Sequence, residues 1–169
     1  LKNEGGISFR DVTEEAGLTP VKRGFATWVF DYNQDGHQDI YLGTFYAQMT
    51  LQLRGLLGYP TKGTHPALFR NNGDGTFTDM APQVGVTGPK ESFPVWFWDF
   101  DNDGALDLYV SNYGEGRESL AAVVANRLGQ PTDYQPAHLY KGDGHGGFEE
   151  VAKAQNLTQL TFPMGVNFG

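Results

Sequence analysis

The 169-residue sequence contains no cysteine. Disulfide scaffolds, thiolate metal sites and cysteine nucleophiles are therefore excluded. The absence of cysteine does not decide the cellular compartment, because a disulfide-free fold can exist on either side of a membrane.

No apolar run approaches the roughly 18 residues of a membrane span. Basic residues are scarce, since 12 Lys and Arg stand against 20 Asp and Glu, for a formal net charge of -8. We expect no nucleic-acid partner, because such a partner needs a basic face.

Glycine and aromatic residues are abundant, with 23 glycines and 14% aromatics. This combination is typical of short strands joined by tight turns, and it argues against disorder, which depletes aromatics.

The sequence repeats itself at an offset of 68 residues. Residues 25–31 (FATWVFD) recur as residues 93–99 (FPVWFWD), and residues 39–42 (DIYL) recur as residues 107–110 (DLYV). Further along, residues 68–77 match residues 139–148 at an offset of 71. The ends follow the same pattern, because residues 9–12 align with 77–80 and residues 162–164 with 93–95. A fixed period of this kind indicates a repeat architecture.

Each repeat predicts four strands. The expected strands are 25–30, 39–44, 67–71 and 76–80 in the first unit, and 93–98, 107–112, 137–141 and 147–151 in the second. Gly-rich turns at 72–75 and 143–146 predict hairpins. Inserts at 45–66 and 113–136 have helical periodicity. Their helices could cover a sheet edge or neighbouring repeat, or form a partner-binding surface.

The strongest chemical signal is an acidic loop between the first and second strands of each unit. Residues 31–39 and 99–107 both read D-x-[DN]-x-D-G-x-x-D. Oxygen ligands at positions 1, 3, 5 and 9, with the backbone carbonyl of position 7, can surround a hard cation, and Gly at position 6 permits the bend. Ca²⁺ is favoured over Mg²⁺ by the number of protein oxygens, and Zn²⁺ is disfavoured without Cys. The loops are not EF-hands, because Leu42 and Val110 stand at position 12 instead of Glu.

These loops, together with residues 70–79 (RNNGDGTFTD), resemble the FG-GAP or VCBS repeat of integrin-α-like β-propellers. The pattern is also similar to bacterial CRTAC and ASPIC/UnbV-type proteins. The resemblance implies an all-β propeller segment with blades at 25–80 and 93–151, the last strand of a preceding blade at 7–12 and the first strand of a following blade at 162–169. It implies two structural Ca²⁺ sites, one formed by Asp31, Asn33, Asp35, His37 and Asp39, the other by Asp99, Asp101, Asp103, Ala105 and Asp107. His37 and Ala105 would contribute carbonyls. Asn33 departs from Asp and lowers the charge of the first loop to -3.

We expect a non-catalytic protein, because none of the four histidines has a recognisable nucleophile and orienting acid near it in the sequence.

The leading hypothesis is a secreted, periplasmic or cell-surface module that binds other blades or protein subunits. One alternative is a carbohydrate-binding propeller in which Trp28, Trp96, Trp98 or the tyrosines of the inserts stack on sugars, although a core position suits the aromatics of the first strands better. Another is the non-catalytic repeat region of a polysaccharide-acting enzyme. Propellers use about four to eight blades, so two blades predict a longer protein, self-association or closure on partner subunits.

Overall fold

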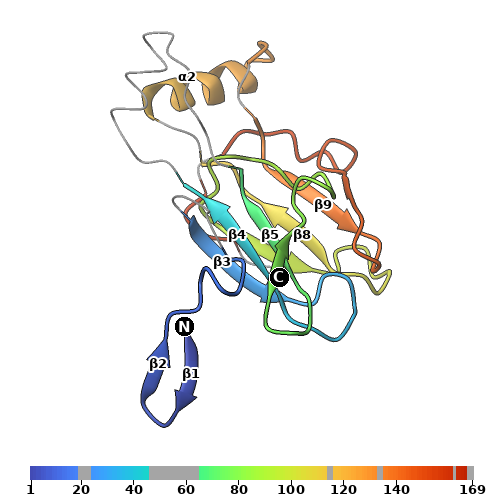
Figure 1. Cartoon of the computed structure of the whole chain (residues 1–169). Coiled ribbons are helices and arrows are strands. Elements are labelled where there is room, and N and C mark those ends of the chain that lie inside the picture. The colour runs from blue at the N-terminus through green and yellow to red at the C-terminus, as the bar shows by residue number, and fades with distance from the viewer. Residues whose placement is uncertain (19–23, 46–64, 114–115, 133–134, 162, 167–169) are drawn as a thin grey trace.

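The computed structural model describes residues 1–18, 24–45, 65–113, 116–132, 135–161 and 163–166. The described part is all-β apart from one helix (Figure 1). The strands are β1 (Lys2–Gly5), β2 (Ser8–Arg10), β3 (Gly24–Phe30), β4 (Asp39–Thr44), β5 (Ala67–Asn71), β6 (Phe77–Asp79), β7 (Val95–Trp98), β8 (Asp107–Val110), β9 (His138–Gly142) and β10 (Phe148–Glu150). The helix is α2 (Gly116–Arg127).

Two four-stranded antiparallel sheets correspond to the two sequence repeats. One has the order β3-β4-β5-β6 and the other the order β7-β8-β9-β10, so each strand pairs with its neighbour along the chain. We call the first sheet blade 1 and the second blade 2. The registers are equivalent, because Trp28 pairs with Tyr41 in blade 1 as Trp96 pairs with Tyr109 in blade 2. The predicted all-β fold with propeller-like blades is thereby confirmed.

The core lies between the facing surfaces of the two blades. Alternate residues of each strand point to the same face of a sheet, so β3 supplies Trp28 and Phe30 while β7 supplies Val95 and Phe97. The rings of Phe30 and Phe97 stack at a centroid distance of 4.7 Å. The indole Nε1 of Trp28 donates a hydrogen bond of 2.5 Å to the Val95 carbonyl. Burial of large apolar side chains, each contributing about 1.5–3 kcal/mol, therefore joins the blades.

Helix α2 lies within the second expected insert, 113–136. The expected apolar stripe is not uniformly covered, because Val124 is 50% exposed and Leu128, just beyond the helix, is 70% exposed. The Asn126 side chain accepts a hydrogen bond of 3.3 Å from the Leu160 amide, which ties the helix to the C-terminal segment. The helix expected in the first insert, 45–66, falls almost entirely outside the described residues.

The N-terminal segment forms a hairpin where a single strand was expected. The segment expected as a single strand at 7–12 contains β2, which pairs with β1 in a hairpin that extends away from both blades (Figure 1). Its apolar residue Ile7 is 98% exposed. At the other end, residues 163–166 form no strand, while 162 and 167–169 lie outside the described residues. The strand over 162–169 stays a prediction.

Candidate metal centre

The two acidic loops connect equivalent strands and have the same backbone shape. Residues 31–39 join β3 to β4, and residues 99–107 join β7 to β8. We call them loop 1 and loop 2. The position-6 glycines, Gly36 and Gly104, have φ of 88° and 90°. The position-4 residues, Gln34 and Asn102, are also left-handed, with φ of 58° and 61°. The glycines were expected from the motif, but nothing in it required a left-handed residue at position 4.

Hydrogen bonds within each loop hold this shape. The position-1 carboxylate of Asp31 accepts from the amides of Asp35 at 3.1 Å and Gly36 at 2.8 Å. Asp99 accepts from the amides of Asp103 and Gly104 at 3.0 and 2.9 Å. The position-5 carboxylates in turn accept from the position-7 amides, those of His37 and Ala105, each at 2.9 Å. The loops are therefore built alike from carboxylate-to-backbone bonds.

The position-9 aspartates, Asp39 and Asp107, have a separate structural role. Both are fully buried. Asp39 accepts from the amides of Tyr32 and Asn71 at 3.2 and 2.8 Å, and Asp107 accepts from those of Phe100 and Gly142 at 2.7 and 2.9 Å.

Each position-9 carboxylate thus links the start of its own loop to the third strand of its blade. Burial raises the pKa of both Asp39 and Asp107, although the two amide hydrogen bonds to each oppose this shift. A buried carboxylate with raised pKa favours a nearby cation, which would stabilise its charged form.

The carboxylates converge fully only in loop 2, among the described residues. One oxygen from each of Asp99, Asp101 and Asp107 lies within 4.8 Å of the others. Three convergent carboxylates match the hard oxygen donors that Ca²⁺ prefers, so the residues of loop 2 fit a divalent cation. Loop 1 differs at position 3, where Asn33 directs its amide nitrogen to Asp35 Oδ2 at 2.9 Å.

A lysine that the sequence analysis missed lies at loop 2. Lys141 of β9 extends its ammonium group to Asp101 Oδ2 and to Asp103 Oδ2, the latter at 2.8 Å. These contacts raise the pKa of Lys141. The repeat itself offered a signal, because Lys141 aligns with Arg70 at the offset of 71 residues, so both blades have a basic residue at this point of the third strand.

Comparison with known families agrees with this geometry. The family model described as an FG-GAP-like repeat matches residues 56–110, which include β5, β6, β7, loop 2 and β8. The chain contains an FG-GAP-like repeat. No curated protein matches the chain. The matched range crosses from blade 1 into blade 2, and the similarity to CRTAC and ASPIC/UnbV-type proteins stays a prediction.

Contacts between the blades connect the two loops. The Gln34 side-chain nitrogen donates a hydrogen bond of 2.6 Å to the Gly104 carbonyl. Tyr32 of loop 1 stacks on Phe148 of blade 2 at a centroid distance of 5.7 Å. The loops therefore lie at the same end of adjacent blades, and a cation bound in one would act on a backbone that the other contacts.

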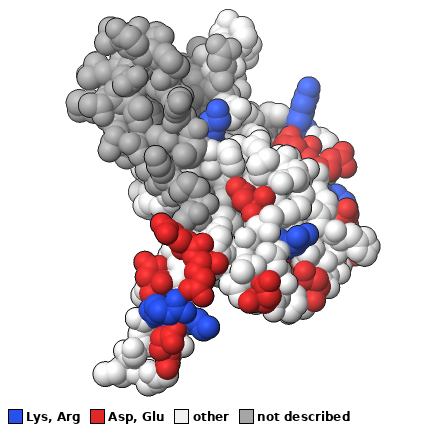
Figure 2. All heavy atoms as spheres, viewed as in Figure 1, with Lys and Arg blue, Asp and Glu red and all other residues white. Residues whose placement is uncertain are grey.

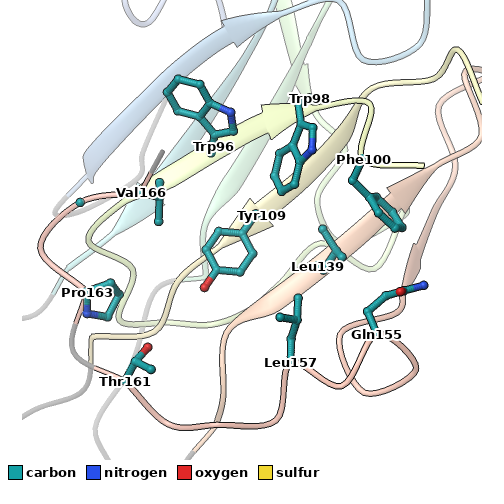
Figure 3. A pocket seen from close by; sticks show the side chains of 11 residues that line it. Trp96, Trp98, Phe100, Tyr109, Leu139, Gln155, Leu157, Thr161, Pro163 and Val166 are labelled. Carbon is teal, nitrogen blue, oxygen red and sulfur yellow. The ribbon is translucent and has the colours of Figure 1, made fainter. Parts of the chain in front are cut away.

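A cavity of about 670 Å³ opens on the face of blade 2 that points away from blade 1 (Figure 3). Aromatic and aliphatic side chains dominate its lining. Five of these residues, Trp96, Trp98, Tyr109, Leu139 and Leu157, are the repeat equivalents of Trp28, Phe30, Tyr41, Leu68 and Val86. The latter five all belong to the core between the blades. The cavity is thus a second copy of the blade-packing surface.

The surface charge is distributed without a large basic area. On the face shown in Figure 2, Lys and Arg side chains of the described residues form no continuous patch. Arg10, one of the basic residues, is paired with Glu4 and Glu15 at 3.1 and 2.5 Å. No described helix is long and apolar enough to cross a membrane.

Proposed function

We propose that this chain is a calcium-stabilised, extracytoplasmic β-propeller module that acts as a protein-interaction or scaffold subunit without catalysis. The observation that carries the proposal is the convergence of Asp99, Asp101 and Asp107 in a loop whose backbone is repeated in the adjacent blade. Asp31, Asn33, Asp35 and Asp39 would hold the cation of loop 1. Asp99, Asp101, Asp103 and Asp107 would hold that of loop 2.

The contribution of Ca²⁺ would be electrostatic. Loop 2 gathers four carboxylates, and like charges at short range oppose one another's ionisation. A bound cation would offset this repulsion and the cost of burying Asp107. Since Asp107 also bonds to the Gly142 amide of β9, the cation would strengthen the link between the loop and the third strand. The same argument applies to Asp39 and the Asn71 amide of β5.

The extracytoplasmic location is supported by the FG-GAP-like repeat, which is typical of extracellular proteins. It is also supported by calcium availability, because weak sites with a Kd of about 10⁻⁴–10⁻³ M are filled only outside the cytosol.

The interaction role is supported by exposed apolar residues on the open faces of both blades. Val29 of blade 1 is 51% exposed, and the half-buried Trp96 and Trp98 line the cavity of blade 2. Large exposed apolar faces are typical of protein contacts.

Carbohydrate binding is a second candidate, favoured by the rings of Trp96, Trp98 and Tyr109 in one cavity. Aromatic rings of this kind can stack on sugars. The repeat equivalents of all three residues pack against a blade, so protein contact remains the preferred function. Titration of soluble oligosaccharides against tryptophan fluorescence separates the two. A saturable change lost in Trp98→Ala would favour the lectin, and no change would favour protein contact.

The calcium proposal is tested by thermal melting in EDTA, in Ca²⁺ and in Mg²⁺, each at two protein concentrations. A ligand that binds only the folded state at 100 times its Kd stabilises that state by about 2.7 kcal/mol. We therefore expect a clear rise in Tm with Ca²⁺ and a smaller one with Mg²⁺. A further rise with protein concentration would indicate self-association. An unchanged Tm in Ca²⁺ would contradict the proposal.

A further inference from the structure

The ammonium group of Lys141 occupies the same acidic surface that a cation in loop 2 would use. It contacts Asp101 and Asp103, which stand at positions 3 and 5 of the loop. We propose that Lys141 is a built-in counter-cation of loop 2, which Ca²⁺ must displace to bind, so that the lysine sets the calcium affinity of this loop. The inference rests on the proposed calcium function and deepens it.

Blade 2 brings Lys141 into this position through its backbone. The neighbouring residue, Gly142, donates its amide to Asp107 Oδ1 at 2.9 Å. A Cβ atom at Gly142 would lie 2.3 Å from the Leu106 carbonyl oxygen, so only glycine permits β9 to approach loop 2 this closely. The close approach carries the Lys141 side chain to the acidic residues. Its position therefore follows from the strand register as well as from charge attraction.

The charges of the two loops are balanced by different means. Loop 2 has four carboxylates and loop 1 has three, because Asn33 replaces an acid. The positive charge of Lys141 reduces the net charge at loop 2 to -3, which equals the charge of loop 1. In loop 1 the Asn33 amide itself bonds to Asp35, whereas in loop 2 the lysine supplies the donor. Each loop thus relieves carboxylate repulsion with a donor from its own blade.

Competition follows from the ligands involved. A divalent cation needs the oxygens of Asp101 and Asp103, and it repels an ammonium group a few ångströms away. Binding of Ca²⁺ to loop 2 therefore requires Lys141 to give up its contacts with Asp101 and Asp103. Loop 1 carries a smaller cost, because Arg70 acts on Asp35 through its charge alone and makes no ion pair with a loop carboxylate among the described residues. We expect loop 1 to bind Ca²⁺ without displacing a side-chain cation.

An ordinary surface ion pair is the alternative explanation. Lys141 and Asp101 are about one-third exposed, and exposed ion pairs contribute little to stability. The two explanations predict different effects on calcium affinity when the lysine is removed. Loss of a stabilising pair lowers Tm with or without Ca²⁺. Loss of a competing cation lowers Tm in EDTA but raises the calcium affinity.

The test compares Lys141→Met, which keeps the apolar stem, with Arg70→Met as the matched variant of blade 1 and with Lys141→Arg, which keeps the charge. Calcium is titrated into each intact chain at low salt, and the amide signals of Gly36 and Gly104 report loops 1 and 2 separately by NMR. We expect Lys141→Met to tighten binding at loop 2 by about tenfold, as a nearby unit charge in a partly exposed site implies. Lys141→Arg should stay near wild type, and Arg70→Met should change loop 1 by less than about twofold.

The failures are distinguishable. Equal calcium affinity of loop 2 in wild type and Lys141→Met would overturn the lysine inference and leave the calcium function standing. No calcium response of either glycine in any variant would overturn both. If Lys141→Met fails to fold in EDTA, Lys141→Gln replaces it, because the amide keeps a hydrogen-bond donor without the charge. An unchanged loop 2 affinity in that variant overturns the inference equally.

Discussion

Loop 1 and loop 2 share one backbone and differ in how their charges are compensated. The left-handed residues at positions 4 and 6 are the same, and so are the amides bonded to the acids at positions 1, 5 and 9. What differs is position 3, an amide in Asn33 and a carboxylate in Asp101, and the lysine that contacts only the second loop. The comparison shows that loop shape comes from hydrogen bonds that loop carboxylates accept from backbone amides. The cation affinity that we propose for each loop would depend on side chains that the shape leaves free to vary.

The largest effects are expected at the position-9 aspartates, where the two loops should behave alike. Replacing Asp39 or Asp107 with Ala leaves two buried amides without an acceptor, at about 1–3 kcal/mol each. Relief of the buried charge offsets part of this loss. We expect each variant to lose about 2–4 kcal/mol of unfolding free energy in EDTA, measured by urea denaturation.

The Asp→Asn variants are the controls, because an amide oxygen keeps one acceptor without the charge. They should lose less stability in EDTA and also lose the calcium response. A loss below about 0.5 kcal/mol in both Ala variants would contradict the role of these residues as links between loop and strand.

A smaller, pH-dependent effect should distinguish the blades. His138 in blade 2 aligns with Ala67 in blade 1. Its Nδ1 lies 2.8 Å from the Tyr140 hydroxyl, and burial lowers its pKa, while Glu150 partly opposes that shift. A lowered pKa in the folded state means that the unfolded chain takes up the proton first. The stability that neutral His138 contributes is present above about pH 6.5 and is lost as pH falls through the lower, folded-state pKa.

We therefore expect the unfolding free energy to decrease from pH 7 to pH 5 more steeply in wild type than in His138→Gln. Urea denaturation at each pH, in EDTA, measures the two slopes. Equal slopes would show that His138 is not responsible, whatever the absolute stability of the variant.

Much of the fold could be predicted because the repeat shows which residues are equivalent. The apolar first strands, the Gly-rich hairpin turns and the acidic loops each occur twice, and all correspond to equivalent elements of the two blades. The sequence could not indicate that β1 precedes β2, since residues 2–5 (KNEG) contain none of the β-branched or aromatic residues that favour strands. Only the hairpin pairing makes β1 a strand.

The candidate site was predicted as a set of residues but not as a set of contacts. The motif identified every acid of both loops, and loop 2 brings three of them together. The motif could not distinguish the position-9 acids from the acids that bond only within the loop. The position-9 acids accept hydrogen bonds from a strand about 32–35 residues further on. Lys141 was missed for the same reason, because its contact with Asp101 spans 40 residues and depends on strand pairing. Long-range register, which no local pattern contains, decides both features.

The central claim is that both loops hold Ca²⁺, and isothermal calorimetry of the wild-type chain at low salt tests it most directly. The account predicts a stoichiometry of two after subtraction of the heat of titrating Ca²⁺ into buffer without protein. Replacing Asp99 with Asn should abolish calcium binding at loop 2 and leave one site. Replacing Asp31 with Asn should do the same at loop 1. No saturable calcium binding up to about 10⁻³ M, the weak limit for extracellular sites, would contradict the account.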